Sequence, residues 1–194
     1  MKKFNLLFML ASGIIAFSSA TAQKDSSGIY KTADDFRNRK LSYAINYKTE
    51  KHKINDNLLF NNADVKVKHA GETYTLSKSE TYGYRNTKGE EFRFIDNKEY
   101  KILNPGQKVL IYTYSVPYQN PKALATIVTR YFFTTEAASS PMELTKANLK
   151  SAFPSNHKLH DALDAEFKTD AELYAYDQFH KMYKLNWLFK NNMN

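Results

Sequence analysis

The sequence predicts an α+β fold in which an antiparallel β-meander sheet of about six or seven strands is followed by two or three C-terminal helices packed on it. Three observations predict this fold. Apolar residues alternate with a period of two through much of residues 41–135, short turns separate these runs, and the period becomes helical from residue 141 onward. Strands first and helices last is typical of an α+β domain whose helices cover one face of the sheet.

The first 22 residues have the pattern of a cleaved secretory signal peptide. Lys2 and Lys3 precede an apolar run from residue 6 to residue 17, and Ala20-Thr21-Ala22 then places small residues at a cleavage site. The apolar run is shorter than the roughly 20 residues that cross a bilayer. The alternative, an uncleaved N-terminal anchor, leaves the small-residue site unexplained. We therefore expect an exported protein, periplasmic or secreted, with no transmembrane segment after signal cleavage.

Residues 23–194 are expected to form a single α+β domain, β-rich over 41–135 and helical over 141–190. The chain has no cysteine, which excludes disulfides, thiolate nucleophiles and cysteine-ligated zinc or iron–sulfur centres. It also has no cysteine at the signal junction to carry a lipid, so a lipoprotein is not expected. Loss of Lys2 and Lys3 lowers the formal net charge from +8 to +6. Because the lysines are spread along the chain, a solvated surface is predicted and nucleic acid is not an expected partner.

The N-terminal part of the mature chain is predicted element by element. Residues 23–31 are polar and are expected to be a loose leader. Thr32 is a predicted helix N-cap, because two aspartates follow in the first turn. Apolar and polar residues alternate from Leu41 to Tyr47, which predicts a strand with one buried face. Residues 49–57 are charged and without apolar period, so we expect a loop there.

Two alternating runs, at residues 65–67 and 74–76, flank a turn at Ala70-Gly71. If the second run continued unbroken, two charged residues would fall on its apolar face, so a bulge or break is expected near residues 77–79.

Further strands follow turns at residues 86–89 and 96–98. Asn104-Pro105-Gly106-Gln107 carries Pro and Gly at the two central positions of a type II turn. The two longest strands are expected over residues 108–116 and about 124–135, joined by a loop with two prolines.

The helical part has three predicted starts. Ser140-Pro141-Met142-Glu143 fits a capping box, and Thr145 is a competing N-cap for a shorter first helix; the sequence leaves both open. Asn156 is predicted to cap a second helix. A second capping box at residues 169–172 predicts a long terminal helix. Its apolar stripe would hold Leu173, Tyr176, His180, Tyr183 and Trp187, which makes His180 an interior, hydrogen-bonded histidine.

Histidine and carboxylate patterns give few candidates for chemistry. His157 and His160 lie three residues apart beside two aspartates, but nothing in the sequence supplies a third ligand, so no metal site is expected. His52 and His69 are possible general bases that lack a nucleophile-elbow serine. Glu80, Glu90, Glu91 and Glu99 occur on or beside strands, where surface positions are expected, although paired carboxylates also serve glycoside hydrolysis. The six glycines form no phosphate-binding pattern, and no cofactor is expected.

The most suggestive feature is aromatic. Thr81-Tyr82-Gly83-Tyr84-Arg85 is expected to place two tyrosines on one strand face, with a glycine that permits close approach of a ligand or a backbone. Tyrosine rings are flat apolar platforms with a polar tip, as used by sugars and protein partners. Tyr82, Tyr84 and Arg85 are therefore the candidate binding residues. The competing interpretation, favoured by strand propensity, is that these rings fill the core of a sheet.

Residues 28–43 (GIYKTADDFRNRKLSY), the Tyr-Gly-Tyr-Arg strand, and the C-terminal Leu144-Thr145, Asn148-Leu149 and Ala175-Tyr176-Asp177 together resemble small exported proteins of Gram-negative bacteria that have no assigned function. The resemblance covers nearly all of the mature chain. It implies export and carries no catalytic residues.

The leading functional hypothesis is a non-enzymatic exported protein that binds an envelope protein, a glycan or a small ligand through its sheet. One alternative is a secreted hydrolase that uses a carboxylate or a histidine in a cleft. Another is a structural component of the cell envelope.

Overall fold

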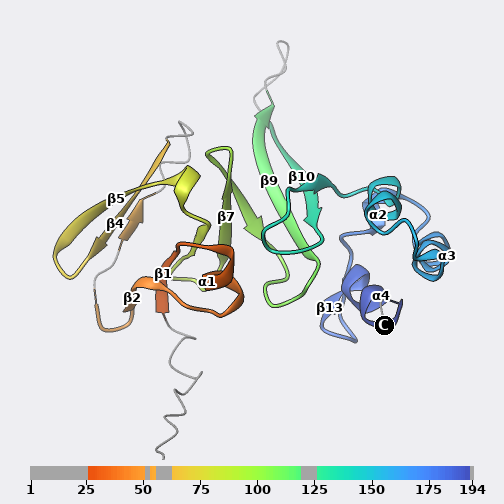
Figure 1. Ribbon diagram of the computed structural model, residues 1–194, viewed down its shortest axis with the longest axis horizontal. Coiled ribbons are helices and arrows are strands. Elements are labelled where there is room, and N and C mark those ends of the chain that lie inside the picture. The colour runs from red at the N-terminus through yellow and green to blue at the C-terminus, as the bar shows by residue number, and fades with distance from the viewer. Residues whose placement is uncertain (1–25, 51–52, 56–62, 119–125, 193–194) are drawn as a thin grey trace, which may run out of the picture.

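The computed structural model describes residues 26–50, 53–55, 63–118 and 126–192, which form an α+β structure built around a large antiparallel sheet (Figure 1). The predicted signal peptide and residues 119–125 lie outside the described residues. Within them, no helix is long and apolar enough to cross a membrane.

The main sheet has eight strands in the order β11-β10-β9-β8-β7-β6-β1-β2. Every neighbouring pair is antiparallel. From one edge to the other the strands are β11 (Met142–Glu143), β10 (Thr126–Thr134), β9 (Leu110–Tyr118), β8 (Lys98–Ile102), β7 (Glu91–Ile95), β6 (Gly83–Arg85), β1 (Ser26–Tyr30) and β2 (Ser42–Asn46). β6 to β11 form the predicted meander. The sheet has eight strands where six or seven were expected, and β1 and β11 are the two that were not predicted.

β1 corrects one prediction. Residues 23–31 were expected to be a loose leader, but Ser26–Tyr30 is a strand that pairs with both β6 and β2. Ile29 and Tyr30 are both fully buried. The strand has no period-two pattern because consecutive side chains enter clusters on opposite faces of the sheet, as in a strand covered on both sides.

Two smaller sheets accompany the main one. β3 (Lys53–Asn55), β4 (Asp64–His69) and β5 (Glu72–Ser77) form a three-stranded sheet at one end of the molecule (Figure 1). The 3₁₀ turn η3 (Lys78–Glu80) then breaks the chain where a break was predicted, and the chain passes from this sheet into the main one. β12 (Tyr176–Asp177) and β13 (Met182–Tyr183) form a short hairpin.

The four α-helices follow local capping chemistry. α1 (Ala33–Arg37) begins at the predicted N-cap Thr32, and the structure adds a capping box in which the Asp35 side chain accepts from the Thr32 amide. α2 (Lys146–Ala152) is capped by Thr145, whose hydroxyl accepts from the Asn148 amide at 3.1 Å, so the shorter of the two predicted helices forms. α3 (His157–Glu166) has Asn156 as its N-cap. α4 (Lys184–Asn192) ends the described chain.

The predicted long terminal helix is wrong. Residues 170–172 form only a 3₁₀ turn (η4, Asp170–Glu172), and the β12–β13 hairpin precedes α4. The helical stripe fails because the Asp177 carboxylate accepts from the amides of Phe179 and His180, closing a turn instead of extending a helix. Lys181, with φ of 54°, then reverses the chain in the left-handed region.

The core has three clusters arranged on the two faces of the main sheet. On one face, α2 to α4 cover β9 and β10 around Ile111 and Phe133. On the same face, the β3–β5 sheet covers the other end around Ile29 and Tyr84. The opposite face carries α1 over Tyr30. The C-terminal helices thus cover one face of the sheet, at one end of it (Figure 1).

Candidate functional site

The candidate binding tyrosines lie in the core, in two different clusters. Tyr82 is 8% exposed and stacks on Phe36 of α1, with ring centroids 5.1 Å apart. Tyr84 is 4% exposed and stacks on Phe92 with centroids 4.8 Å apart. The two rings therefore do not form the single platform that the sequence predicts, and their role as binding residues stays a prediction. Arg85 is half-buried beside Gly89.

Gly83 explains the Tyr-Gly-Tyr pattern. A Cβ added at Gly83 would lie 1.9 Å from the Phe92 carbonyl oxygen and 2.9 Å from the Arg93 Cα. The close approach predicted for this glycine is thus made by the backbone of β7, and only a residue without a side chain fits there.

The other histidine candidates are dispersed. His160 Nε2 lies 2.9 Å from the Phe153 carbonyl oxygen, and the His157 and His160 rings contact edge to face at 5.8 Å. The described residues contain no group of three or more His, Asp or Glu side chains that could hold a metal ion. His69 lies at the end of β4 against the Tyr43 ring. His52 lies outside the described residues.

The strand glutamates do not converge on a pair. Glu80 is exposed, Glu90 accepts from Lys101 Nζ at 2.6 Å, and Glu99 accepts from the Tyr84 hydroxyl at 2.7 Å. Glu91 was predicted at the surface, but it is buried, with only 4% of it exposed. Its carboxylate accepts from Arg39 Nη1, which lies 2.6 Å from Oε2. This ion pair supplies the partner that a buried charge requires.

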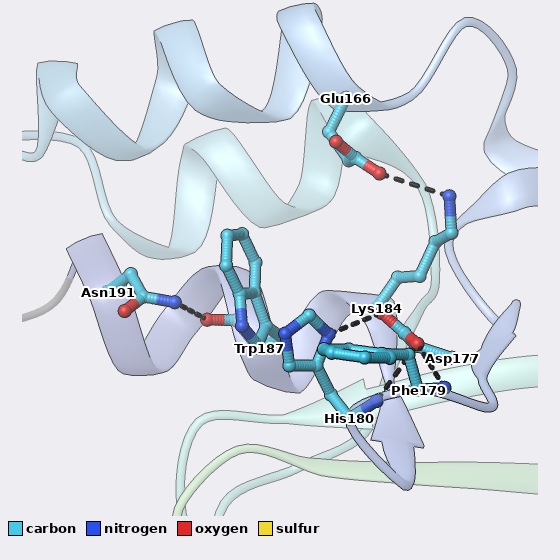
Figure 2. Close-up of polar contacts among 7 residues, drawn as sticks. All are labelled: Glu166, Asp177, Phe179, His180, Lys184, Trp187 and Asn191. Atoms are coloured by element: carbon cyan, nitrogen blue, oxygen red, sulfur yellow. Dashed lines mark hydrogen bonds and ion pairs between the residues drawn. The ribbon is translucent and has the colours of Figure 1, made fainter.

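The candidate site is formed by the turn of the β12–β13 hairpin together with the first turn of α4, and we call it the aromatic turn (Asp177, Phe179, His180 and Trp187). Figure 2 shows the His180 ring between the rings of Phe179 and Trp187. The centroids lie 4.9 Å apart for Phe179 and His180 and 5.2 Å apart for His180 and Trp187. Phe179 is 88% exposed and Trp187 is 40% exposed. These side chains form a surface feature that is apolar and open to solvent.

Asp177 fixes the shape of the aromatic turn. Its Oδ1 accepts from the Phe179 amide at 2.8 Å and the His180 amide at 3.1 Å, and its Oδ2 lies 2.7 Å from His180 Nδ1. These bonds, that from the imidazole foremost, lower the pKa of Asp177 to about 2. The carboxylate is therefore ionised at neutral pH and holds both the backbone of the turn and the orientation of the His180 ring.

Two polar contacts lie in the neighbourhood of the rings (Figure 2). Lys184 Nζ lies 3.1 Å from Glu166 Oε1 of α3, and both side chains are more than 40% exposed (Figure 2). The amide of Asn191 donates to the Trp187 carbonyl oxygen at 2.8 Å and holds the end of α4. Donors and acceptors thus stand beside an exposed apolar surface, which suits binding of an amphipathic ligand.

Sequence reasoning missed the aromatic turn because it assigned residues 169 onward to one helix. The available signal was Asp177-Gln178-Phe179-His180, in which an aspartate precedes two residues whose amides it can cap. His180 was expected inside the core, but it lies at the surface with its Asp177 hydrogen bond.

No protein-family model, curated protein or solved structure matches this chain.

Proposed function

We propose that this chain is an exported, non-enzymatic binding protein of the cell envelope, and that it binds a glycan through the aromatic turn. The signal-peptide pattern of residues 1–22 supports export to the periplasm or beyond, and the lack of cysteine supports a protein without a lipid anchor. An envelope protein is the alternative partner.

One observation carries the proposal: Phe179 is 88% exposed on a turn whose backbone is fixed by Asp177. Large apolar side chains in water are unfavourable, and a flexible loop would allow the ring to fold back onto the protein. Here the turn holds the ring outward before any ligand arrives. A rigid, pre-formed contact reduces the entropy that is lost on binding.

The chemistry of the surroundings favours a sugar. Aromatic rings stack on the apolar faces of sugar rings, while hydroxyls require hydrogen-bond partners at the edge of the stack. The exposed Lys184–Glu166 pair offers a donor and an acceptor beside the rings. Because Asp177 already accepts three hydrogen bonds, its role is to hold the turn and not to contact the ligand.

The experiment is co-sedimentation of residues 23–194 with purified insoluble envelope glycan. Phe179→Ala is expected to weaken binding about tenfold, since loss of an aromatic contact removes about 1–3 kcal/mol of binding free energy. The fold should be unchanged, because Phe179 is exposed. Gln178→Ala, at the exposed neighbouring position, is the matched control and should bind like the parent chain.

Binding that is equal in Phe179→Ala and in the parent chain would refute the aromatic turn as the glycan site. If glycan is not bound but an envelope protein is retained in a pull-down that depends on Phe179, the partner is that protein. Absence of both kinds of binding would favour a structural role.

A second candidate, a hydrolase, rests on the Asp177–His180 contact of 2.7 Å, since an aspartate that orients an imidazole is one part of a catalytic triad. The aromatic turn includes no hydroxyl or thiol side chain to act as a nucleophile, so binding accounts for more of the arrangement. Turnover of ester or glycoside substrates that disappears in His180→Gln would favour the hydrolase.

A further inference from the structure

A second candidate site lies on the opposite side of the main sheet from the C-terminal helices, beside α1. It is a cavity of about 300 Å³ between α1, the turn at residues 105–107 and the loop after β10. Phe36 and Ala137, both buried, give it an apolar floor. This volume is at the lower end of the range for small-molecule sites.

The polar lining of the cavity is mainly cationic. Arg37, Arg39 and Lys108 contribute positive charges, against the single carboxylate of Glu136. Arg37 forms an ion pair with Asp34, and Arg39 forms one with Glu91. Among the residues that the structure describes, no carboxylate lies within 4.0 Å of the Lys108 ammonium. The lysine is exposed at the rim, where its charge remains available to a ligand.

Arg39 is held in place at a cost to the backbone. It follows the C-cap of α1 with φ of 57°, in the left-handed region that glycine or asparagine usually occupies. Its Nη1 binds the buried Glu91 carboxylate, and its guanidinium lies 5.5 Å from the Phe36 ring centroid. Its Nη2 faces Gly106, where an added Cβ would lie 3.2 Å from this nitrogen. The guanidinium is therefore a fixed wall of the cavity.

We propose that this cavity binds a small organic carboxylate with one apolar group. The apolar group would lie on Phe36 and Ala137, and the carboxylate would face Arg37 and Lys108 at the rim, where charge-assisted hydrogen bonds are strongest for cationic donors. Glu136 disfavours dianions and leaves a single negative charge as the best match. This site is separate from the aromatic turn and does not depend on the proposed glycan binding.

The test is an NMR titration of residues 23–194 with 3-phenylpropanoate, using 3-phenylpropanamide as the uncharged analogue of the same shape. We expect the acid to bind with a dissociation constant of about 1 mM or tighter, and the amide at least about tenfold more weakly. Backbone signals of residues 36–39 and 106–108 should shift with the acid.

Lys108→Gln is expected to weaken acid binding about three- to tenfold without affecting the fold, because the side chain is exposed. Lys168→Gln, an exposed lysine outside the cavity lining, is the matched control for net charge. Glu136→Gln should leave binding of the acid equal or tighter. Equal affinity for acid and amide, equal effects of the two lysine substitutions, or no shift at the cavity up to 10 mM acid would each overturn the proposal.

Discussion

Replacement of Gly83 by alanine should separate β6 from β7 and so disconnect the two parts of the main sheet. The added Cβ would lie 1.9 Å from the Phe92 carbonyl oxygen, whereas Cβ contacts below 3.0 Å essentially do not occur. The obstructing atoms belong to backbone, which cannot rotate away as a side chain does. The β7 backbone would therefore have to move by more than 1 Å.

The size of the effect follows from what this movement breaks. Overpacking costs about 1–3 kcal/mol where side chains adjust, and each lost backbone hydrogen bond adds about 1 kcal/mol, so we expect a loss of about 4 kcal/mol or more. The bond from the Phe94 amide to the Tyr82 carbonyl oxygen, 2.8 Å long, is among those at risk. Because β6 is the link between β7 and β1, the buried Ile29 and Tyr30 also lose support.

The assay is urea denaturation followed by far-ultraviolet circular dichroism, together with thermal unfolding. For a chain of this size we expect the Gly83→Ala midpoint to fall by at least about 8 °C. Gly71→Ala is the control, because it has open space around its Cβ position but a φ of +86°, a strain that costs about 1–2 kcal/mol. If Gly83→Ala were no less stable than Gly71→Ala, the reasoning about close strand approach would be refuted.

Two further predictions concern buried polar groups. Asn104→Leu should destabilise the protein by about 2–3 kcal/mol, and more than Asn186→Leu does. The reason is that Asn104 accepts from the Ile111 amide at 2.6 Å and donates to the Val109 carbonyl oxygen at 2.8 Å. Urea denaturation of both variants measures the difference, and a larger loss in Asn186→Leu would contradict the prediction. Burial, with Glu91 next in importance, raises the pKa of Tyr30 to about 12, so the folded state retains a proton that the unfolded state releases near pH 10. The free energy of unfolding should therefore fall by about 2 kcal/mol between pH 10 and pH 12 because of this group. In Tyr30→Phe the fall over the same pH series should be shallower. Equal pH slopes of the unfolding free energy in the two proteins would exclude Tyr30 as the cause.

Three predictions that depended on neighbouring residues were confirmed, whereas the capping boxes predicted at residues 140–143 and 169–172 did not start helices. The Thr32 cap of α1, the Asn156 cap of α3 and the turn at Asn104–Gln107 formed as expected. Gly106 has the positive φ, +95°, that a type II turn requires at its third position. Such features are encoded in a few adjacent side chains and backbone groups, so the sequence can show them directly.

The aromatic turn could not be predicted in the same way. A period of apolar residues favoured a helix from residue 169 over the competing turn signal of Asp177, and the hydrogen bonds of Asp177 show that the chain reverses there. Whether Phe179 is exposed or buried depends on how the β12–β13 hairpin and α4 are placed in the fold. Its 88% exposure is therefore a property of the tertiary structure.

The α+β class, the absence of cysteine chemistry and the position of the main-sheet meander before the C-terminal helices follow from the sequence alone. Packing between distant segments inserts Ser26–Tyr30 between β6 and β2, buries Glu91 against Arg39, and directs Tyr82 and Tyr84 into different clusters, none of which the sequence shows. The physical reason is the range of the interactions. Caps and turns depend on residues a few positions apart, whereas the partner of a strand or of a buried charge comes from tens of residues away and is set by packing.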